Sequence, residues 1–595
     1  MRRAIRLVFA LIGLAIVASA VGTLVLYLLV SREPAVEQRS TLVLRPGGDL
    51  PEVAGGGLGG SFFGGGADSL RGFIDNLRKA KRDPRISGVL LMPSALQAPY
   101  WARLQELRDA ILDFRTSGKA VVAFLEYGGD REYYLASAAD RVFLLPTSPL
   151  ELTGVASYEM FLRGTLDLLG TYPDFLHIGQ YKTATNQLTE KTFTAAHREM
   201  ASSMNKDTYE QLVHGIASAR RKSDAEVRAL IDQGPFLPAD AVRAGLVDGL
   251  AYEDQLDEKV SPPKSAGRGV ARIEGSDYRR VSERSVGIRP RSRIAIVYAI
   301  GEITSGKGGF DPLNGAVAGS DTVVEQIRRI RDDDSIKAIV VRIDSPGGSS
   351  TASDVIWREL MITRDAQPSR PIVTSMSDLA ASGGYYIALP AHVIVAEPGT
   401  LTGSIGIYGG KMVTSGTMHK VGLNMESVTS GRNAAIESPL APYTAEQRGK
   451  MQGILEDFYR QFLEKVATSR HMTVEQVDAL GQGRVWTGQQ AKQRGLVDEL
   501  GGLDTAVAIA KQRAKIPAGE DAELVIYLSR PSLIETIADR FGSRLGGSLG
   551  SHNQSLGLWG LTAGVIDRRA LAAAAPLRLF RRGEPLALMP YGFFR

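Results

Sequence analysis

The chain has 595 residues, too many for one ordinary hydrophobic core, so we expect two or more domains. Hydrophobic residues make up 44% and charged residues 23%, as in globular proteins, and 70 basic against 65 acidic residues leave a net charge of +5. This mild charge, without a long basic run, argues against a nucleic-acid-binding protein. The absence of cysteine excludes disulfides, thiolate metal sites and cysteine nucleophiles.

The N-terminal segment predicts a transmembrane helix. Arg2, Arg3 and Arg6 precede an uncharged stretch from Leu7 to Val30, which at about 1.5 Å per residue exceeds the ~30 Å hydrocarbon core. Ala18-Ser19-Ala20 resembles a signal-peptide cleavage site, but the apolar run continues beyond it, which favours an uncleaved anchor. The arginines place the N-terminus in the cytoplasm, so everything from Ser31 onward would lie outside it, in the periplasm if the source is a Gram-negative bacterium. We expect a single-pass protein of the bacterial cytoplasmic (inner) membrane, with the repeats on the periplasmic or extracytoplasmic side.

The rest of the sequence is written twice, with an offset of about 250 residues. The matched positions share residue type and spacing; they include Arg78 and Arg328, Asp83 and Asp333, Tyr133 and Tyr385, and Gly245–Asp248 and Gly495–Asp498. Such agreement predicts a duplicated domain.

Helical and strand patterns alternate within each copy, which predicts an α/β fold with a largely parallel sheet. In the second copy, apolar residues at helical spacing predict a helix over 322–331, and a β-branched run predicts a strand over 336–343. Further strands are expected over 293–300 and 371–375, and a long helix over 443–467.

We therefore predict five segments along the chain. They are the cytoplasmic N-terminus, anchor and short linker (1–38), a first repeat (39–260), a linker rich in Pro, Ser, Gly and Arg (261–291), a second repeat (292–515) and a C-terminal tail (516–595). The tail mixes apolar residues with arginines, so it could be solvated, pack against another subunit or touch a membrane surface.

A serine in a turn of small residues is the candidate nucleophile. Ser382 directly follows a predicted strand and precedes a helical pattern, where backbone N–H groups favour a developing oxyanion. The preceding strand ends in Asp344-Ser-Pro-Gly-Gly348, whose glycines leave further N–H groups free to face a carbonyl oxygen. Considered alone, the serine would also fit a glycine-assisted packing turn.

A lysine is the candidate base, because none of the seven histidines lies in a motif that suggests a triad. Lysine can accept a proton once desolvation makes it neutral, whereas arginine stays charged. Lys182 of the first repeat aligns with Arg432 of the second, and Ser382 aligns near Asp130 of the first. Each repeat is therefore incomplete, and together they predict one composite site.

These motifs resemble the long, tandem form of signal peptide peptidase A, also called protease IV. The resemblance covers nearly the whole chain and rests on four segments, Tyr181–Ala184, Asp344–Gly348, Ala381–Tyr386 and Leu401–Gly406. It implies that Ser382 attacks the peptide carbonyl and that Lys182 is the general base. It further implies that Ser404 hydrogen-bonds the lysine amine, and that Gly348 and Gly383 form a backbone oxyanion hole.

The resemblance also implies two tandem repeats of the crotonase and caseinolytic-protease type and a homotetramer, with neither metal nor cofactor. The expected function is that of a membrane-anchored serine endopeptidase that uses a Ser/Lys dyad to degrade cleaved signal peptides at the cytoplasmic membrane. A crotonase-like acyl-transfer enzyme could use the same Pro-Gly-Gly turn, but coenzyme A is cytoplasmic. An inactive membrane-attached scaffold would be expected to have lost Ser382 or Lys182, and both are present.

Overall fold

The computed structural model describes residues 33–53, 69–260, 271–311, 315–527, 586–589 and 593–594, with four isolated positions nearer the N-terminus. The chain divides into two compact units, of which the first comprises Met1–Ala98, Arg103–Gly154 and Leu212–Arg289. The second comprises Pro99–Ala102, Val155–Gln211 and Pro290–Arg595. Residues 155–211, which belong to the first repeat in the sequence, are thus part of the second compact unit.

The first unit contains a parallel six-stranded sheet of order β11-β7-β5-β3-β1-β12. Its strands are β1 (Ser40–Leu44), β3 (Ile86–Leu91), β5 (Ala120–Leu125), β7 (Arg141–Leu144), β11 (Gly249–Leu250) and β12 (Arg272–Glu274). The accompanying helices are α3 (Leu70–Arg82), α4 (Ala102–Arg115), α5 (Asp130–Ala136), α9 (Asp224–Ile231), α10 (Pro238–Arg243), α11 (Asp257–Val260) and α12 (Gly275–Tyr278). The central strands are nearly continuous apolar runs, as a parallel sheet buried on both faces requires.

Part of the predicted linker is folded into this sheet. Strand β12 pairs with β1, and the buried Tyr278 of α12 donates a hydrogen bond to the Asp83 carboxylate at 3.0 Å. The Pro, Ser and Gly content of 261–291 is typical of a linker. The residues that form β12 and α12 are too few to give a pattern of their own, and their pairing partners lie far away in the sequence.

The second unit contains a larger, mostly parallel eight-stranded sheet with the main path β23-β21-β19-β17-β13-β25. Its strands are β13 (Ser292–Ile300), β17 (Ile336–Ser345), β19 (Ile372–Ala381), β20 (Val393–Ala396), β21 (Leu401–Gly403), β23 (Val485–Thr487), β24 (Glu499–Leu500) and β25 (Ala522–Tyr527). A second sheet has the order β10-β22-β26-β18-β14-β16-β15. Its strands are β10 (Tyr172–Ile178), β14 (Glu302–Thr304), β15 (Gly309–Asp311), β16 (Gly315–Gly319), β18 (Gly347–Ser349), β22 (Ile407–Val413) and β26 (Leu586–Leu588).

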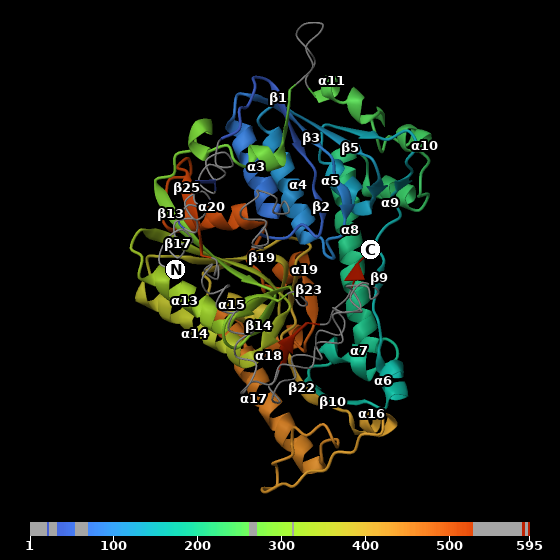
Figure 1. Cartoon of the computed structure of the whole chain (residues 1–595), viewed down its shortest axis with the longest axis vertical. Coiled ribbons are helices and arrows are strands. Elements are labelled where there is room, and N and C mark those ends of the chain that lie inside the picture. Colours follow the sequence, from blue (N-terminus) through green and yellow to red (C-terminus); the bar gives the residue numbers. More distant parts are fainter. Residues whose placement is uncertain are drawn as a thin grey trace, which may run out of the picture. The chain divides into compact units, whose positions relative to one another are not determined.

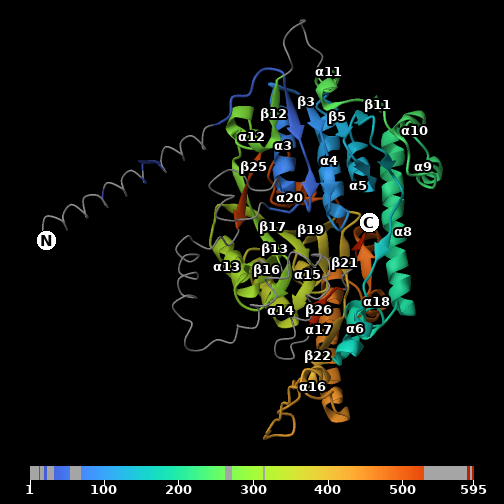
Figure 2. The ribbon, with the colours of Figure 1, turned by 45° about the vertical axis from the view of Figure 1, so that its right-hand side comes forward.

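Helices surround these sheets, and α13 and α14 pack side by side (Figures 1 and 2). The helices are α6 (Arg163–Leu169), α7 (Asn186–Thr189), α8 (Ala195–Arg220), α13 (Ser320–Arg331), α14 (Ser350–Ala366), α15 (Gly383–Ala388), α16 (Ser415–Lys420), α17 (Ala445–Arg470), α18 (Val474–Leu480), α19 (Gly488–Gln493) and α20 (Leu503–Arg513). Helix α8 is shared, because its residues from Leu212 onward belong to the first unit. Alternate residues of β13 share one apolar core with α13 and α14, since side chains of a strand alternate between its faces. The predicted helices and strands of this copy agree with α13, α17, β13, β17 and β19.

Both copies retain the same packing contacts around a buried tyrosine. The hydroxyl of Tyr133 donates to the carbonyl of Leu246 at 2.6 Å, and that of Tyr385 donates to Leu496 at 2.8 Å. The duplication predicted from the sequence is therefore also present in hydrogen-bond geometry.

The prediction of a transmembrane helix is corrected by the structure. Crossing a bilayer takes about 20 consecutive apolar residues in one helix, and no helix among the described residues has that length and apolar character. Most of Leu7 to Val30 lies outside the described residues. The described part of the chain is thus a mixed α/β fold in which the predicted spanning helix is not found, and this finding contradicts the predicted single-pass location in a bacterial inner membrane.

Candidate active site

Ser382 lies at the junction of a strand and a helix in the second unit. It follows β19 directly and is the residue before α15, with φ +55° and ψ −113°. A positive φ is unfavourable for a residue with a side chain and is found where surrounding contacts enforce it. Here the Ser382 amide donates to the Gly403 carbonyl at 2.7 Å, and its carbonyl accepts from the Tyr386 amide at 2.9 Å. The side chain is completely buried.

Lys182 reaches this serine from a turn that follows β10. Its amide donates to the Gly179 carbonyl at 3.1 Å, which closes the turn. Its Nζ lies 2.7 Å from Ser382 Oγ, 3.0 Å from Ser404 Oγ and 3.2 Å from the Ser404 carbonyl oxygen. The three side chains predicted to share a site are therefore in direct contact, and all belong to the second unit.

Burial sets the protonation of this amine. Lys182 has an exposed fraction of 0%, and desolvation lowers its pKa well below the ordinary value for lysine, because a charged ammonium loses its hydration there. A neutral amine has a lone pair, so Nζ can accept the proton of a hydroxyl at this distance.

The two predicted oxyanion-hole glycines also lie close together. A Cβ added to Gly383 would lie 3.2 Å from the amide nitrogen of Gly348, so the two backbone segments are in contact. Gly348 has φ +153°, and an added Cβ there would lie 2.1 Å from the Ile303 carbonyl oxygen. Only glycine fits this close approach, which supports the backbone of β18 beside Ser382.

A turn formed by Gly481–Arg484 packs against the backbone of Lys182. The sequence patterns did not indicate this turn. The Tyr181 amide donates to the Gln482 carbonyl at 2.8 Å. Gly483 has φ +76°, and a Cβ added to it would lie 2.5 Å from N, Cα and Cβ of Lys182. The backbone of Lys182 therefore rests directly on Gly483.

The same turn also holds the segment that carries Ser404. The Gly483 amide donates to the Ile405 carbonyl, and the Ser404 amide donates to the Arg484 carbonyl, both at 2.7 Å. The turn thus touches both Lys182 and the segment of its hydrogen-bond partner Ser404. The two glycines of the motif Gly-Gln-Gly-Arg were the available sequence signal, and in the structure Gly483 is the one with a positive φ.

The counterparts in the other copies have different surroundings. Arg432, aligned with Lys182, has an 80% exposed side chain beside Glu446. Asp130, aligned with Ser382, begins α5 and accepts hydrogen bonds from the amides of Thr153 and Gly154 at 3.0 and 2.9 Å. Neither position pairs a hydroxyl with a buried amine.

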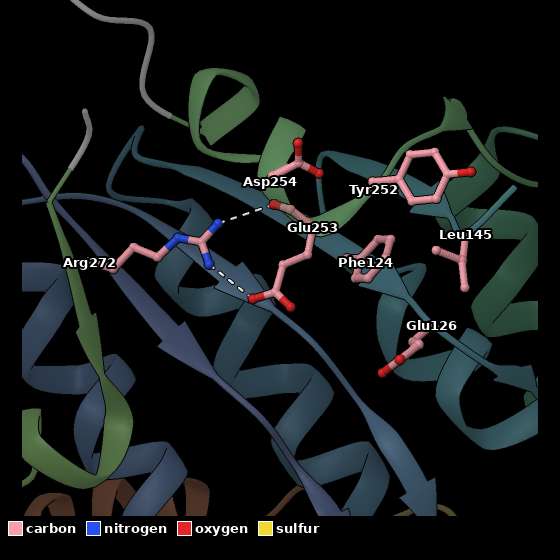
Figure 3. Close-up of a pocket in the computed structure, with 7 residues that line it drawn as sticks. All are labelled: Phe124, Glu126, Leu145, Tyr252, Glu253, Asp254 and Arg272. Carbon is pink, nitrogen blue, oxygen red and sulfur yellow. Dashed lines mark hydrogen bonds and ion pairs between the residues drawn. The ribbon is translucent and has the colours of Figure 1, made fainter. Parts of the chain in front are cut away.

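A pocket in the first unit is chemically different. Figure 3 shows its lining by Phe124, Glu126, Leu145, Tyr252, Glu253, Asp254 and Arg272. The Arg272 guanidinium hydrogen-bonds the Glu253 carboxylate at 3.0 Å and the Glu253 carbonyl at 3.2 Å. None of these lining residues is a serine or a lysine, so the pocket does not offer the chemistry found around Ser382.

Comparison with known proteins gives consistent matches. The family model described as "Peptidase family S49" matches residues 113–265 and 364–517, one segment in each repeat. The chain is 37% identical over 473 residues to "Serine protease SPPA, chloroplastic" of Arabidopsis thaliana, covering 78% of this chain and 68% of that protein. It is 33% identical over 501 residues to "Protease 4" of Salmonella typhi, covering 81% and 78%. "Protease 4" of Haemophilus influenzae is 32% identical over 451 residues, covering 73% and 71%.

Proposed function

Because this chain belongs to peptidase family S49 and is a serine protease, we propose that Ser382 is its nucleophile and Lys182 its general base. The observation that carries this assignment is the 2.7 Å contact between a buried amine and the hydroxyl of a serine held at positive φ. Ser404 is proposed to orient the amine, which it contacts at 3.0 Å.

The reaction follows from these positions. Ser382 Oγ attacks the peptide carbonyl carbon while its proton passes to Nζ of Lys182. The amides of Gly348 and Gly383 stabilise the negative oxygen of the tetrahedral intermediate. The leaving amine takes the proton from the Lys182 ammonium, and a water molecule activated by Lys182 then hydrolyses the acyl-enzyme.

A pH–rate profile of peptide hydrolysis tests this assignment. Activity should rise with pH through an apparent pKa well below the ~10.4 of free lysine, because the base must be neutral. Ser382→Ala and Lys182→Ala should each lower kcat by at least about a thousandfold, and Lys182→Arg should not restore it because arginine stays protonated.

Matched controls make the outcome decisive. Ser469→Ala removes a half-buried serine hydroxyl that donates to the Leu389 carbonyl at 2.8 Å rather than contacting Lys182, and should retain most of kcat. Hydrolysis that survived Lys182→Ala or Ser382→Ala would refute the proposed dyad.

We propose that the preferred substrates are apolar extended peptides, of which cleaved signal peptides are the natural candidates. Apolar side chains next to the dyad support this proposal: Ala184, Tyr408 and partly buried Phe175 form one cluster. Mass spectrometry of the fragments formed from a synthetic signal peptide measures this preference directly.

We also propose that the protein assembles as a homotetramer. Large apolar side chains that a monomer leaves exposed support an interface between subunits: Leu168 (80% exposed), Val421 (68%), Leu423 (61%), Met425 (55%) and Val428 (101%). They come from α6 and from the segment that follows α16, all within the second unit.

A further inference from the structure

A short strand near the C-terminus lies against the candidate oxyanion hole. Strand β26 pairs antiparallel with β18, where Ala587 is opposite Gly348 and Leu588 is opposite Gly347. On its other side it pairs antiparallel with β22, where Leu586 is opposite Tyr408. The next residue continues the contact, because the Met589 amide donates to the Pro346 carbonyl at 2.9 Å.

This pairing uses the last available edge of β18. A strand has two edges for hydrogen bonding, and β14 already pairs with β18 through Ile303 and Gly348. An extended peptide can therefore add to the backbone beside Gly348 only where β26 now lies. The position is that of a peptide bound by strand addition, in which main-chain pairing gives affinity and alternate side chains enter pockets.

The side chains of this segment enter two apolar clusters, one on each side. Leu586 is 1% exposed and packs with Ala184 and Tyr408. Ala184 is two residues after Lys182, so this cluster adjoins the proposed base.

Met589 occupies the second cluster and is 2% exposed. Its neighbours there include Ala381, the residue before Ser382, and Leu379. The two buried side chains therefore flank the proposed dyad and fill sites that apolar substrate side chains would need.

We propose that the segment Leu586–Met589 is an intramolecular competitor of the peptide substrate. It occupies the substrate strand between β18 and β22, and its two buried side chains mark subsites that select apolar residues three positions apart. This inference rests on the proposed function, because the strand blocks substrate only if Gly348 and Ser382 form the reaction site.

The test measures peptide binding in the full-length protein with the nucleophile removed. The probe is a fluorescein-labelled peptide Pro-Leu-Ala-Leu-Met-Pro, the sequence of residues 585–590. Its affinity for Ser382→Ala is compared by fluorescence anisotropy with its affinity for Ser382→Ala carrying Leu586→Ala and Met589→Ala. Weakening the internal competitor should lower the Kd of the probe about tenfold, because less of the protein is occupied by its own strand.

Two controls isolate the competition. Val525→Ala truncates a side chain in β25, which pairs with β13 and not with β18, and should leave the Kd unchanged. A probe with aspartate in place of its methionine and of the leucine at position 586 should bind at least about tenfold more weakly, since both subsites are apolar.

An unchanged or higher Kd in the Leu586→Ala, Met589→Ala protein would overturn the inference. Loss of its circular dichroism spectrum would do so too, because β26 would then be a structural strand. The binding measurement needs no catalysis, so it separates failure of this inference from failure of the proposed dyad, which the hydrolysis of Ser382→Ala reports.

Discussion

The most consequential single residue is Lys182, whose amine is buried among neutral partners. Its near contacts are the hydroxyls of Ser382 and Ser404 and the carbonyl of Ser404, and desolvation is the cause that lowers its pKa. No carboxylate is among the described partners of this amine, and such a buried amine is costly to protonate, which is a disadvantage for folding and an advantage for a general base.

This cost predicts a gain of stability when the amine is removed. In the pH range between the lowered folded pKa and the unfolded value, the unfolded chain binds more protons, so stability rises with pH across that window. At pH 7, Lys182→Met should therefore raise the free energy of unfolding by at least about 1 kcal/mol, which is measured as a higher urea midpoint than that of wild type. This gain in stability should shrink towards pH 10. An equal or lower midpoint at pH 7 would contradict the proposed desolvation.

The sequence predicted which residues form the candidate site, but not the backbone conformation of its serine. The complementary loss of residues in the two repeats pointed to Lys182 and Ser382, because chemistry limits which side chains can serve as nucleophile and base. Their backbone strain was not predictable, since nothing in the local sequence around Ser382 requires φ +55°.

Among elements, the turn Gly481–Arg484 determines where the lysine sits. It contacts the backbone of Lys182 and holds the Ser404 segment by two backbone hydrogen bonds of 2.7 Å. A displacement of about 1 Å in catalytic groups can cost on the order of a hundredfold in rate. We infer that this turn positions the proposed base, Lys182.

Gly483→Ala tests that role. The new Cβ would lie 2.5 Å from Lys182, so the lysine must move, and kcat should fall at least about tenfold with little change in KM. The apparent pKa of the pH–rate profile should shift as well, because the amine changes its burial.

Gly118→Ala is the matched control. Gly118 has φ +78°, close to the +76° of Gly483, but an added Cβ there meets nothing within 4 Å. It carries the same conformational cost without the contact, so its kcat and pH profile should match wild type. If both variants behaved alike, the turn would have no positioning role.

Elements with strong periodicity were predictable and short paired strands were not. The spacing of apolar residues indicated α13 and α17, and β-branched runs indicated β13 and β17, because long buried elements impose their period on the sequence. Strands β18 and β26 have three residues each and are paired across more than 200 positions. Such pairing depends on tertiary contacts, for which a single sequence has no local signal.

At the scale of the whole molecule, hydropathy alone led to the wrong conclusion. The spanning helix was predicted from one apolar run, whereas the described helices pack their apolar faces against sheets. The duplication was more informative, because comparing the sequences of the two copies showed which candidate catalytic residue each copy lacks.

The exposed apolar side chains predict a concentration-dependent assembly. Size-exclusion chromatography with light scattering should give about four times the 64.0 kDa mass of the chain. Val428→Asp should shift this mass downwards, because a charge would be buried at the proposed interface. Glu426→Gln, which changes charge in the same exposed segment without adding a buried carboxylate, serves as the control. A wild-type monomer at micromolar concentration would contradict the proposed tetramer.

The assignment of residues 155–211 to the second unit has an evolutionary consequence. An ancestral gene of one repeat would have needed its own base and nucleophile, whereas here the proposed base and the proposed nucleophile come from different copies. Once both losses had occurred, deletion of either copy would remove an indispensable group, so the duplication could no longer be reversed. The stretch of the first copy that carries the proposed base is also the stretch that belongs to the compact unit of the second copy.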